Sequence, residues 1–267
     1  MRGQPTASAS LTAGLKTLRL PTFTALHEEV ALKAEKEGWS FGTYLSQLVE
    51  RELVERDRRR LARQLKASKL PTTKTLATLD TDRLSPKVKR LLPRLCEGDF
   101  IARAENVLAF GLPGRGKTHL LCAIGHELIR RGHTVLFIST CHLVQRLLAA
   151  RQELKLERVL ARLESFDAVI VDDIGYVQQS REEMEVLFTF LAERYERKSV
   201  LLSSNLVFSQ WDRIFKDPMT TAAAIDRLVH HSTILELTGP SYRTQTAEQR
   251  QAVGDPSPAP ESSPGEG

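Results

Sequence analysis

Residues 106–118 read NVLAFGLPGRGKT, an apolar stretch that leads into a glycine-rich loop. The last eight of these residues match the pattern G-x-x-x-x-G-K-[ST] in full, and an amphipathic segment, residues 117–131, follows them. Glycines let the backbone turn so that its N–H groups point at a phosphate, and the helix N-terminus adds favourable partial charge. The pattern predicts a nucleotide-binding loop made of Gly111, Pro113, Gly114, Arg115, Gly116, Lys117, Thr118 and His119. Lys117 is expected at the β- and γ-phosphates, and Thr118 on Mg²⁺.

Short apolar runs alternate with helical patterns after this loop. Runs rich in β-branched residues predict strands at 106–110, 134–138, 167–171, 199–203 and 233–237. The segments between them predict helices at 117–131, 140–150, 155–164, 181–197 and 219–230. This alternation favours an α/β three-layer sandwich, in which helices cover both faces of a five-stranded parallel sheet.

Two further predicted strands end in polar residues. Asp172 and Asp173 close the run FDAVIVDD, and Asn205 follows LLSS. Open parallel sheets bind ligands at the carboxyl ends of their strands, so we expect these side chains near the phosphate loop. Asp172 is predicted to hold Mg²⁺ and Asp173 to polarise the attacking water, although either could simply cap the turn that follows. Asn205 can donate and accept hydrogen bonds, which suits a sensor of the terminal phosphate.

The chain before the phosphate loop has a different character. Residues 1–15 are rich in Ser, Thr, Ala and Gly and are expected to be disordered. Residues 16–70 form a predicted helical module, 71–105 a connector and helix, and 106–245 the α/β domain. The Pro- and Ser-rich tail, 246–267, is again expected to be disordered.

A basic helix is predicted at the end of the helical module. Residues 1–100 carry 19 Lys and Arg against 12 Asp and Glu, although the whole chain has a net charge of only +5. Arg56, Arg59, Arg60 and Arg63 recur at three- and four-residue steps and so share one helix face. Such a stripe suits the phosphates of DNA. A solvated face with intrahelical partners Glu52, Glu55 and Asp57 is the alternative.

Composition excludes several other classes of protein. Hydrophobic residues make up 41% of the 267 residues and charged residues 27%, which is typical of a globular chain and not of collagen or a disordered protein. Three cysteines without CxxC spacing indicate spare thiols in a reducing compartment. The N-terminus lacks an apolar signal region and no apolar run could cross a membrane, so we expect a cytoplasmic protein. His230 and His231 have no partner at metal-ligand spacing and are predicted to be structural.

Several motifs taken together resemble those of the IstB-type helper ATPases of insertion-sequence transposition, members of the AAA+ class. They are GLPGRGKTHL at 111–120, VIVDDIGY at 169–176, LFTFLAERYERKSVLLSSNLVFSQW at 187–211, IDRLVHH at 225–231 and LTGPSYR at 237–243. The resemblance covers about residues 17–245 and extends, more distantly, to DnaC-type helicase loaders. It implies ATP and Mg²⁺ as ligands, an ATP-dependent homo-oligomer, non-specific binding of duplex DNA, and a transposase as partner. It also implies that Arg227 reaches a neighbour's ATP and that Arg243 is a second sensor; without it, each arginine would be read as a surface ion pair.

The chain departs from the family pattern at two positions. Asp173 stands where many AAA+ proteins have Glu, and its shorter side chain predicts slow hydrolysis. Arg115 replaces the Thr or Ser common before the last glycine of the loop. A replicative helicase loader and a weakly hydrolysing ATP-binding adaptor remain alternative functions. A small-molecule kinase is disfavoured, because the chain after Ser203 lacks a basic lid and an acceptor pocket.

Overall fold

We describe the protein from a computed structural model, whose described residues are 7–175, 180–211, 218–239 and 241–242. The predicted tail, 246–267, lies outside these residues. The chain divides into two compact units, residues 1–66 and 67–267. None of the described helices is both long and apolar enough to cross a membrane.

The second unit is built on a parallel sheet of five strands, as predicted. They are β1 (Asn106–Phe110), β2 (Val135–Ser139), β3 (Ala168–Ile174), β4 (Ser199–Ser204) and β5 (Ser232–Glu236). Their order in the sheet is β2-β3-β4-β1-β5. Every residue of β1 and β4 is buried, which explains the apolar runs at residues 107–110 and 200–202 within them.

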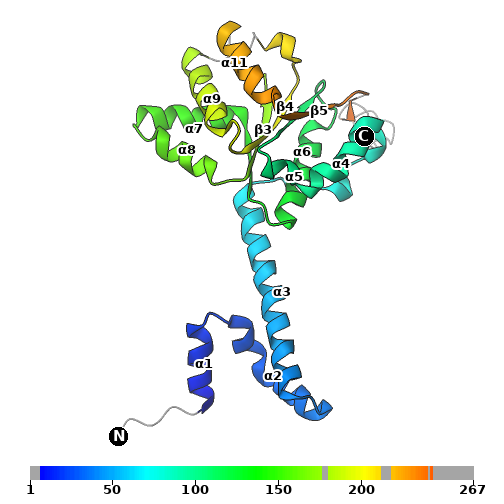
Figure 1. Cartoon of the computed structure of the whole chain (residues 1–267), viewed down its shortest axis with the longest axis vertical. Coiled ribbons are helices and arrows are strands. Elements are labelled where there is room, and N and C mark those ends of the chain that lie inside the picture. The colour runs from blue at the N-terminus through cyan, green and yellow to red at the C-terminus, as the bar shows by residue number, and fades with distance from the viewer. Residues whose placement is uncertain (1–6, 176–179, 212–217, 240, 243–267) are drawn as a thin grey trace, which may run out of the picture. The chain divides into compact units, whose positions relative to one another are not determined.

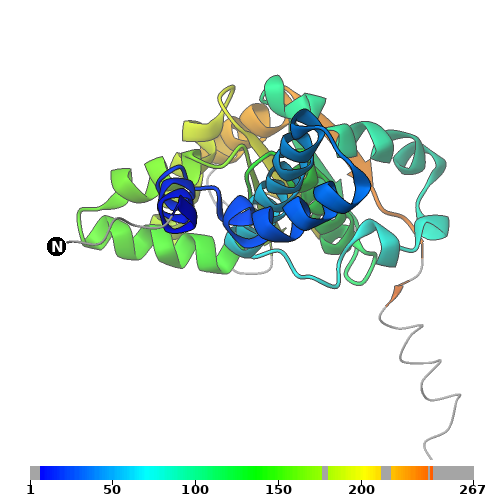
Figure 2. The same ribbon diagram turned by 90° about the horizontal axis from the view of Figure 1, so that it is seen from below.

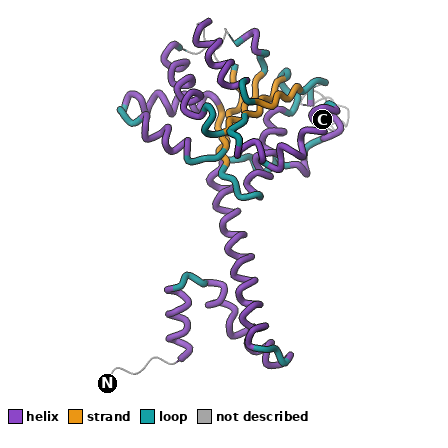
Figure 3. Tube along the Cα trace, in the orientation of Figure 1, coloured by secondary structure: helices purple, strands orange, loops and turns teal. Residues whose placement is uncertain are grey.

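Helices cover both faces of this sheet (Figure 3). One face is covered by α6 (Lys117–Arg130), against which α4 (Pro86–Glu97) packs; α5 (Asp99–Ala102) follows α4. The other carries α7 (Thr140–Gln152), α8 (Leu156–Glu164), α9 (Arg181–Arg194) and α11 (Pro218–Val229). Trp211 and Phe190 are almost fully buried on this second face. Each large apolar side chain buried in this way contributes about 1.5–3 kcal/mol to stability.

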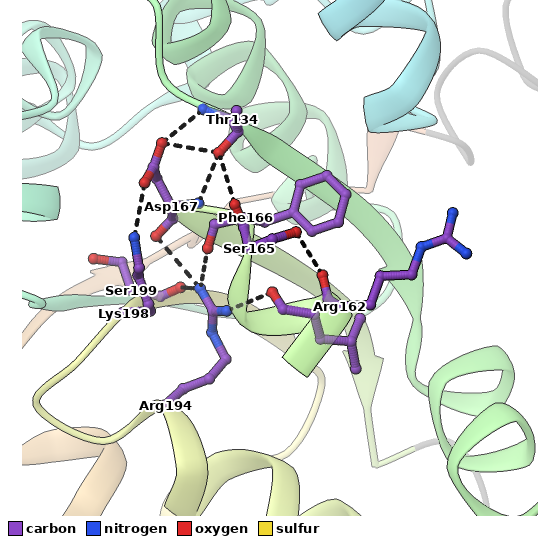
Figure 4. A network of polar contacts seen from close by, with 9 residues as sticks. Thr134, Arg162, Ser165, Phe166, Asp167, Arg194, Lys198 and Ser199 are labelled. Atoms are coloured by element: carbon purple, nitrogen blue, oxygen red, sulfur yellow. Dashed lines mark hydrogen bonds and ion pairs between the residues drawn. The ribbon is translucent and has the colours of Figure 1, made fainter. Parts of the chain in front are cut away.

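A polar network holds the amino ends of three strands together (Figure 4). The buried guanidinium of Arg194 donates to the carbonyl oxygens of Leu163 and Ser199 at 2.9 Å, and to that of Phe166 at 3.1 Å. Beside it, the Asp167 carboxylate accepts bonds from the Thr134 backbone N–H and the Lys198 ammonium, each at 2.9 Å. Hydrogen bonds to Arg194 and Asp167 thereby hold the starts of β2, β3 and β4 together.

These contacts also decide the charge of the network. Burial lowers the pKa of Arg194 to about 10, so this guanidinium remains protonated at neutral pH. Burial would raise the pKa of Asp167, but the Thr134 and Lys198 hydrogen bonds outweigh it and leave the pKa below its usual value. Both groups are therefore charged wherever the protein is folded near neutral pH.

The first unit contains α1 (Ala7–Thr17), α2 (Pro21–Glu37) and most of α3 (Phe41–Ser68). Helix α1 contacts α2 (Figures 1 and 2). The expectation that residues 1–15 are disordered is therefore wrong from Ala7 onward. The composition argument overlooked Leu11, Leu15 and Leu18, which recur at helical spacing, and Leu15 is only 8% exposed. Burial of Leu15 supplies packing energy that Ser- and Thr-rich composition does not reveal.

A buried carboxylate joins α2 to α3. Glu52 of α3 is 3% exposed and accepts a 2.8 Å hydrogen bond from the backbone N–H of Thr22, in the first turn of α2. Arg59 and Arg56 approach the same carboxylate at 3.2 and 3.5 Å. Burial alone would raise the pKa of Glu52, but the Thr22 hydrogen bonds and the two arginines outweigh burial and lower it.

The Arg194 network predicts a large stability difference between two neighbouring arginines. Arg194→Ala leaves several buried carbonyl oxygens without their donor, and we expect it to lower the free energy of unfolding by about 3 kcal/mol or more. Arg197→Ala removes a half-exposed arginine, and its expected cost is below about 1 kcal/mol. Urea denaturation followed by fluorescence measures both variants. Equal losses in the two would contradict the role of the network.

Glu52 predicts an acid-sensitive first unit. Because its pKa is lowered on folding, its contribution to stability is complete above the unfolded value of 4.5 and is lost as pH falls through the lower folded value. Glu52→Gln should reduce stability at neutral pH and flatten the pH dependence below 4.5. Glu55→Gln, at an exposed pair with Arg58, is the control and should behave as wild type. Circular dichroism between pH 3 and 7 measures the effect, and superimposable curves for all three proteins would count against it.

Candidate nucleotide-binding site

The predicted phosphate loop joins β1 to α6, as its sequence requires. Gly114 has φ +81° and Gly116 has φ +85°, in the left-handed region that favours glycine. A Cβ atom on Gly114 would lie 2.1 Å from the Ser241 hydroxyl oxygen. The loop is thus tightly folded, with the N-terminus of α6 directly behind it.

Lys117 connects the loop to the neighbouring strand. It is 6% exposed, and its ammonium donates to the carbonyl oxygens of Gly111 at 2.6 Å and Leu112 at 3.0 Å. It also donates to the amide oxygen of Asn205, just after β4, at 2.5 Å. The Asn205 amide nitrogen in turn donates to Asp173 at 2.8 Å. Three residues predicted from separate motifs therefore form one continuous chain of hydrogen bonds.

Thr118 and Asp172 are also adjacent. The Thr118 hydroxyl donates to Asp172 Oδ1 at 2.8 Å, and the hydroxyl of Ser203 on β4 donates to the same oxygen at 2.6 Å. A hydroxyl and a carboxylate beside a phosphate loop are the oxygen ligands that Mg²⁺ prefers. The donor set therefore fits a magnesium ion, which Thr118 and Asp172 would hold.

Ser203 has a second role that the sequence did not single out. Its hydroxyl oxygen accepts a 2.8 Å hydrogen bond from the backbone N–H of Asp173. Asp173 lies in an irregular part of the β3–β4 pairing and has φ +64°, a costly conformation for a residue other than glycine. The Ser203 hydroxyl thus bonds both the carboxylate of Asp172 and the backbone N–H of Asp173.

A cavity of about 550 Å³ opens beside the loop, which is a typical size for a small-molecule site. Its walls include the phosphate loop, Asp173, Ser203, Asn205, Thr238, Gly239 and Tyr242. The remaining wall comes from the connector before α4, which the sequence analysis left without a function. The connector residues that line the cavity are Thr73, Lys74, Thr78, Leu79, Asp80, Arg83 and Leu84.

Two histidines of α6 hold this connector in place. His119 Nε2 lies 3.1 Å from the Thr75 carbonyl oxygen, and His126 Nε2 lies 3.0 Å from that of Pro71. They are seven residues apart and therefore share one face of α6. His119 was predicted as a nucleotide contact from its position in the GKTH sequence. Its hydrogen bond to the connector was not predicted.

The remaining predicted residues lie around or away from the cavity. Arg115 lines it and donates to the Leu237 carbonyl oxygen at 3.3 Å. Tyr242 stacks on the Arg83 guanidinium at 5.0 Å, and Arg243 lies outside the described residues. Arg227 is not among the described residues that line the cavity. Its guanidinium lies 4.6 Å from the ring centre of Phe188 on α9.

The predicted DNA-contact arginines all lie in the first unit. Arg56 and Arg59 contact Glu52, as the alternative interpretation expected, and Arg60 pairs with Asp57 at 3.3 Å. Arg63 is exposed. The stripe therefore splits into arginines that neutralise a buried carboxylate and others that face solvent.

His230 and His231 differ from the prediction that they lack an acidic partner. The Glu196 carboxylate approaches them at 3.9 and 3.8 Å, and the Tyr195 hydroxyl is 2.9 Å from His230. These groups precede β4 and β5, at the opposite edge of the sheet from the phosphate loop. They take no part in the nucleotide site.

The strand order, with the phosphate loop after β1 and the acidic residues on β3, defines an ATP-binding protein of the AAA+ P-loop class. Solved structures agree: DnaA bound to AMPPCP and single-stranded DNA has a TM-score of 0.55 at 18% identity, covering 69% of this chain and 56% of that chain. DnaI has a TM-score of 0.52 at 23% identity, covering 68% of this chain and all of that one. At these identities the likeness shows the fold alone.

Sequence comparison narrows the class to a family. Residues 13–250 match the model of the IstB-like ATP binding proteins. An insertion-sequence ATP-binding protein of Sinorhizobium fredii is 44% identical over 91% of this chain and 82% of its own length. The IS21 ATP-binding protein of Pseudomonas aeruginosa is 37% identical over 89% of both chains. The chain belongs to the IstB-like ATP-binding family, as its motifs indicated.

The loop geometry predicts a sharp effect of one methyl group. Gly114→Ala would combine a strained φ with a steric conflict at the Ser241 side chain, so the loop or Ser241 must shift. We expect ATP affinity to fall at least about tenfold, with the fold retained. Gly14→Ala has open space around its Cβ and is the control. Titration with a fluorescent ATP analogue measures the affinities, and unchanged binding by Gly114→Ala would exclude this loop conformation from the binding-competent state.

Proposed function

We propose that this protein binds and slowly hydrolyses Mg-ATP, assembles on duplex DNA in an ATP-dependent way, and assists the transposase of an insertion sequence. The observation that carries the ATPase part is the hydrogen-bonded chain Lys117–Asn205–Asp173 beside the Thr118–Asp172 pair. A cation, an amide and two carboxylates therefore lie close together at the edge of the sheet, which supports the proposed roles toward ATP.

Each of these groups has a role toward ATP. The loop N–H groups and Lys117 bind the phosphates, and the connector and Tyr242 enclose the rest of the nucleotide in the cavity. Thr118 and Asp172 would hold Mg²⁺, which neutralises charge on the phosphates. Asp173 accepts the proton of the attacking water, and Asn205 orients that water. Because Asp173 is one methylene shorter than Glu, we expect slow turnover.

Arg227 supports a role for a second subunit. It does not line the cavity of its own chain, and the resemblance to the family implies that it contacts the ATP of a neighbouring protomer. ATP bound between two protomers then stabilises the oligomer, because the bound nucleotide favours the assembled state.

The DNA and transposase parts rest on the relatives and on charge. The relatives are named as ATP-binding proteins of insertion sequences, and the excess of basic residues lies in the first 100 residues. Binding to phosphates through these residues would be independent of sequence and strongly dependent on salt. A helicase loader is the second candidate, because the motifs of this chain also resemble, more distantly, those of DnaC-type helicase loaders.

The deciding experiment measures DNA binding and particle size of the full-length protein with ATP, with ADP and without nucleotide. Random-sequence duplex and single strands serve as probes. We expect large complexes on duplex DNA with ATP only, and their loss in Lys117→Ala. Asp173→Asn should keep ATP-dependent assembly and lose hydrolysis by about a hundredfold or more.

Other outcomes select among the alternatives. Preference for single strands, together with a stable complex with a replicative helicase, would favour the helicase loader. ATP binding without hydrolysis above background in the wild type would indicate a non-hydrolysing adaptor, and equal measurable hydrolysis by wild type and Asp173→Asn would exclude Asp173 as the base. Failure to bind DNA in all three nucleotide conditions would overturn the DNA part of the proposal and leave the ATP site intact.

A further inference from the structure

The first unit contains a groove that no motif identified. It has a volume of about 720 Å³ and lies where the end of α1, the start of α2 and the middle of α3 meet. Five cationic side chains line it, and Glu52 is the single carboxylate among its lining residues. The cations are Lys16, Arg19, Arg56, Arg59 and Arg63.

We propose that this groove binds the phosphodiester backbone of duplex DNA. The inference rests on the proposed function and assigns the DNA contact to particular residues. It retains Arg56, Arg59 and Arg63 of the predicted stripe, adds Lys16 and Arg19 from another part of the chain, and leaves out Arg60, which pairs with Asp57 and does not line the groove.

The positive charge of the groove is only partly cancelled from within. Glu52 is buried and already shared between Thr22, Arg59 and Arg56, and those two arginines still expose about half of their side chains. Lys16, Arg19 and Arg63 are exposed. Three full charges therefore lie beside two half-neutralised ones, a surplus that only an anion from outside the unit can balance.

Arg19 is fixed at the edge of this groove by its backbone conformation and by a hydrogen bond. Arg19 has φ +56° just after α1, at the position of a helix end where glycine or asparagine is least strained. Its carbonyl oxygen accepts a 3.2 Å hydrogen bond from Arg56, so the residue is held against α3. This contact holds the backbone of Arg19 beside the groove that its side chain lines.

The chemistry of the lining favours a nucleic acid over a protein partner. Four of the five cations are arginines, whose planar guanidinium groups bind phosphate oxygens in pairs. A duplex presents one negative charge about every 1.7 Å of its axis, so several of these cations can meet phosphates at the same time. An acidic segment of a partner protein is the competing occupant, and the test includes it.

The test compares two triple variants of equal charge. The groove variant, Lys16→Gln/Arg19→Asn/Arg63→Gln, spares Arg56 and Arg59, which the Glu52 site needs, and Arg19→Asn relieves the backbone strain. The control variant, Lys36→Gln/Arg58→Gln/Arg60→Gln, removes three exposed charges of the same unit that do not line the groove. Fluorescence anisotropy with a random-sequence duplex and ATP gives the affinity between 50 and about 300 mM salt.

We expect the groove variant to bind at least about tenfold more weakly than wild type near 0.1 M salt, and to lower the salt slope of log K by about 2 to 3. The control variant should stay within about threefold of wild type. Both should keep wild-type affinity for ATP, since that site belongs to the second unit. If the triple variant unfolds, Lys16→Gln/Arg63→Gln, which changes only exposed side chains, takes its place.

The experiment distinguishes a failure of the groove proposal from a failure of the proposed function. Wild-type DNA binding by the groove variant would overturn the groove and leave the proposed function standing, as would equal losses in the two triple variants. Binding of poly-glutamate, but not of duplex, through the groove residues would assign the groove to an acidic protein. A wild-type protein that binds no DNA would overturn the groove together with the DNA part of the proposed function.

Discussion

The parallel register of β1, β4 and β3 is the constraint on which the nucleotide site depends. Val107 lies opposite Leu201, and Leu201 lies opposite Ile170, so the three strands end at nearly the same level. The residues at and after the ends of these strands therefore lie close together in space. A slip of one residue would move a strand by about 3.3 Å and reverse the direction of its side chains. No contact of Lys117 with Asn205 would survive such a slip.

The two edges of the sheet serve different purposes. At the amino edge, the buried guanidinium of Arg194 and the part-buried carboxylate of Asp167 are charged and bond several backbone groups, which suits them to hold strands in register. At the carboxyl edge, Asp173 occupies a strained backbone conformation and faces a cavity. Rigid packing at the amino edge lets Asp173 keep its strained conformation at the carboxyl edge. The strands between the two edges cannot move to relax that strain.

Glu52 plays a comparable organising role in the first unit. Its carboxylate closes the first turn of α2 and draws Arg56 and Arg59 to the same side of α3. A salt bridge of this kind is weak support for stability by itself, since burying the carboxylate costs nearly as much as its partners return. Its consequence is geometric, because it brings the α3 arginines toward the end of α1.

The local sequence pattern predicted much of the fold and of the nucleotide site. The loop GLPGRGKT, the buried strands and the polar residues at their ends depend on neighbours in the chain, and Lys117, Thr118, Asp172, Asp173 and Asn205 come together as predicted. The helix at Ala7–Thr17, by contrast, was missed because its stability comes from burial of Leu15 and not from its own composition.

Tertiary structure alone decided the rest. The Ser203 hydroxyl joins two aspartates across a neighbouring strand, the connector forms a wall of the cavity through histidines 44 and 55 residues away, and Lys16 and Arg19 join arginines from a different helix. Ser203, His126, Lys16 and Arg19 carry no signal in their own neighbourhood. Each acquires its role from a hydrogen bond or a charge supplied by a distant segment, and such partners exist only after the chain has folded.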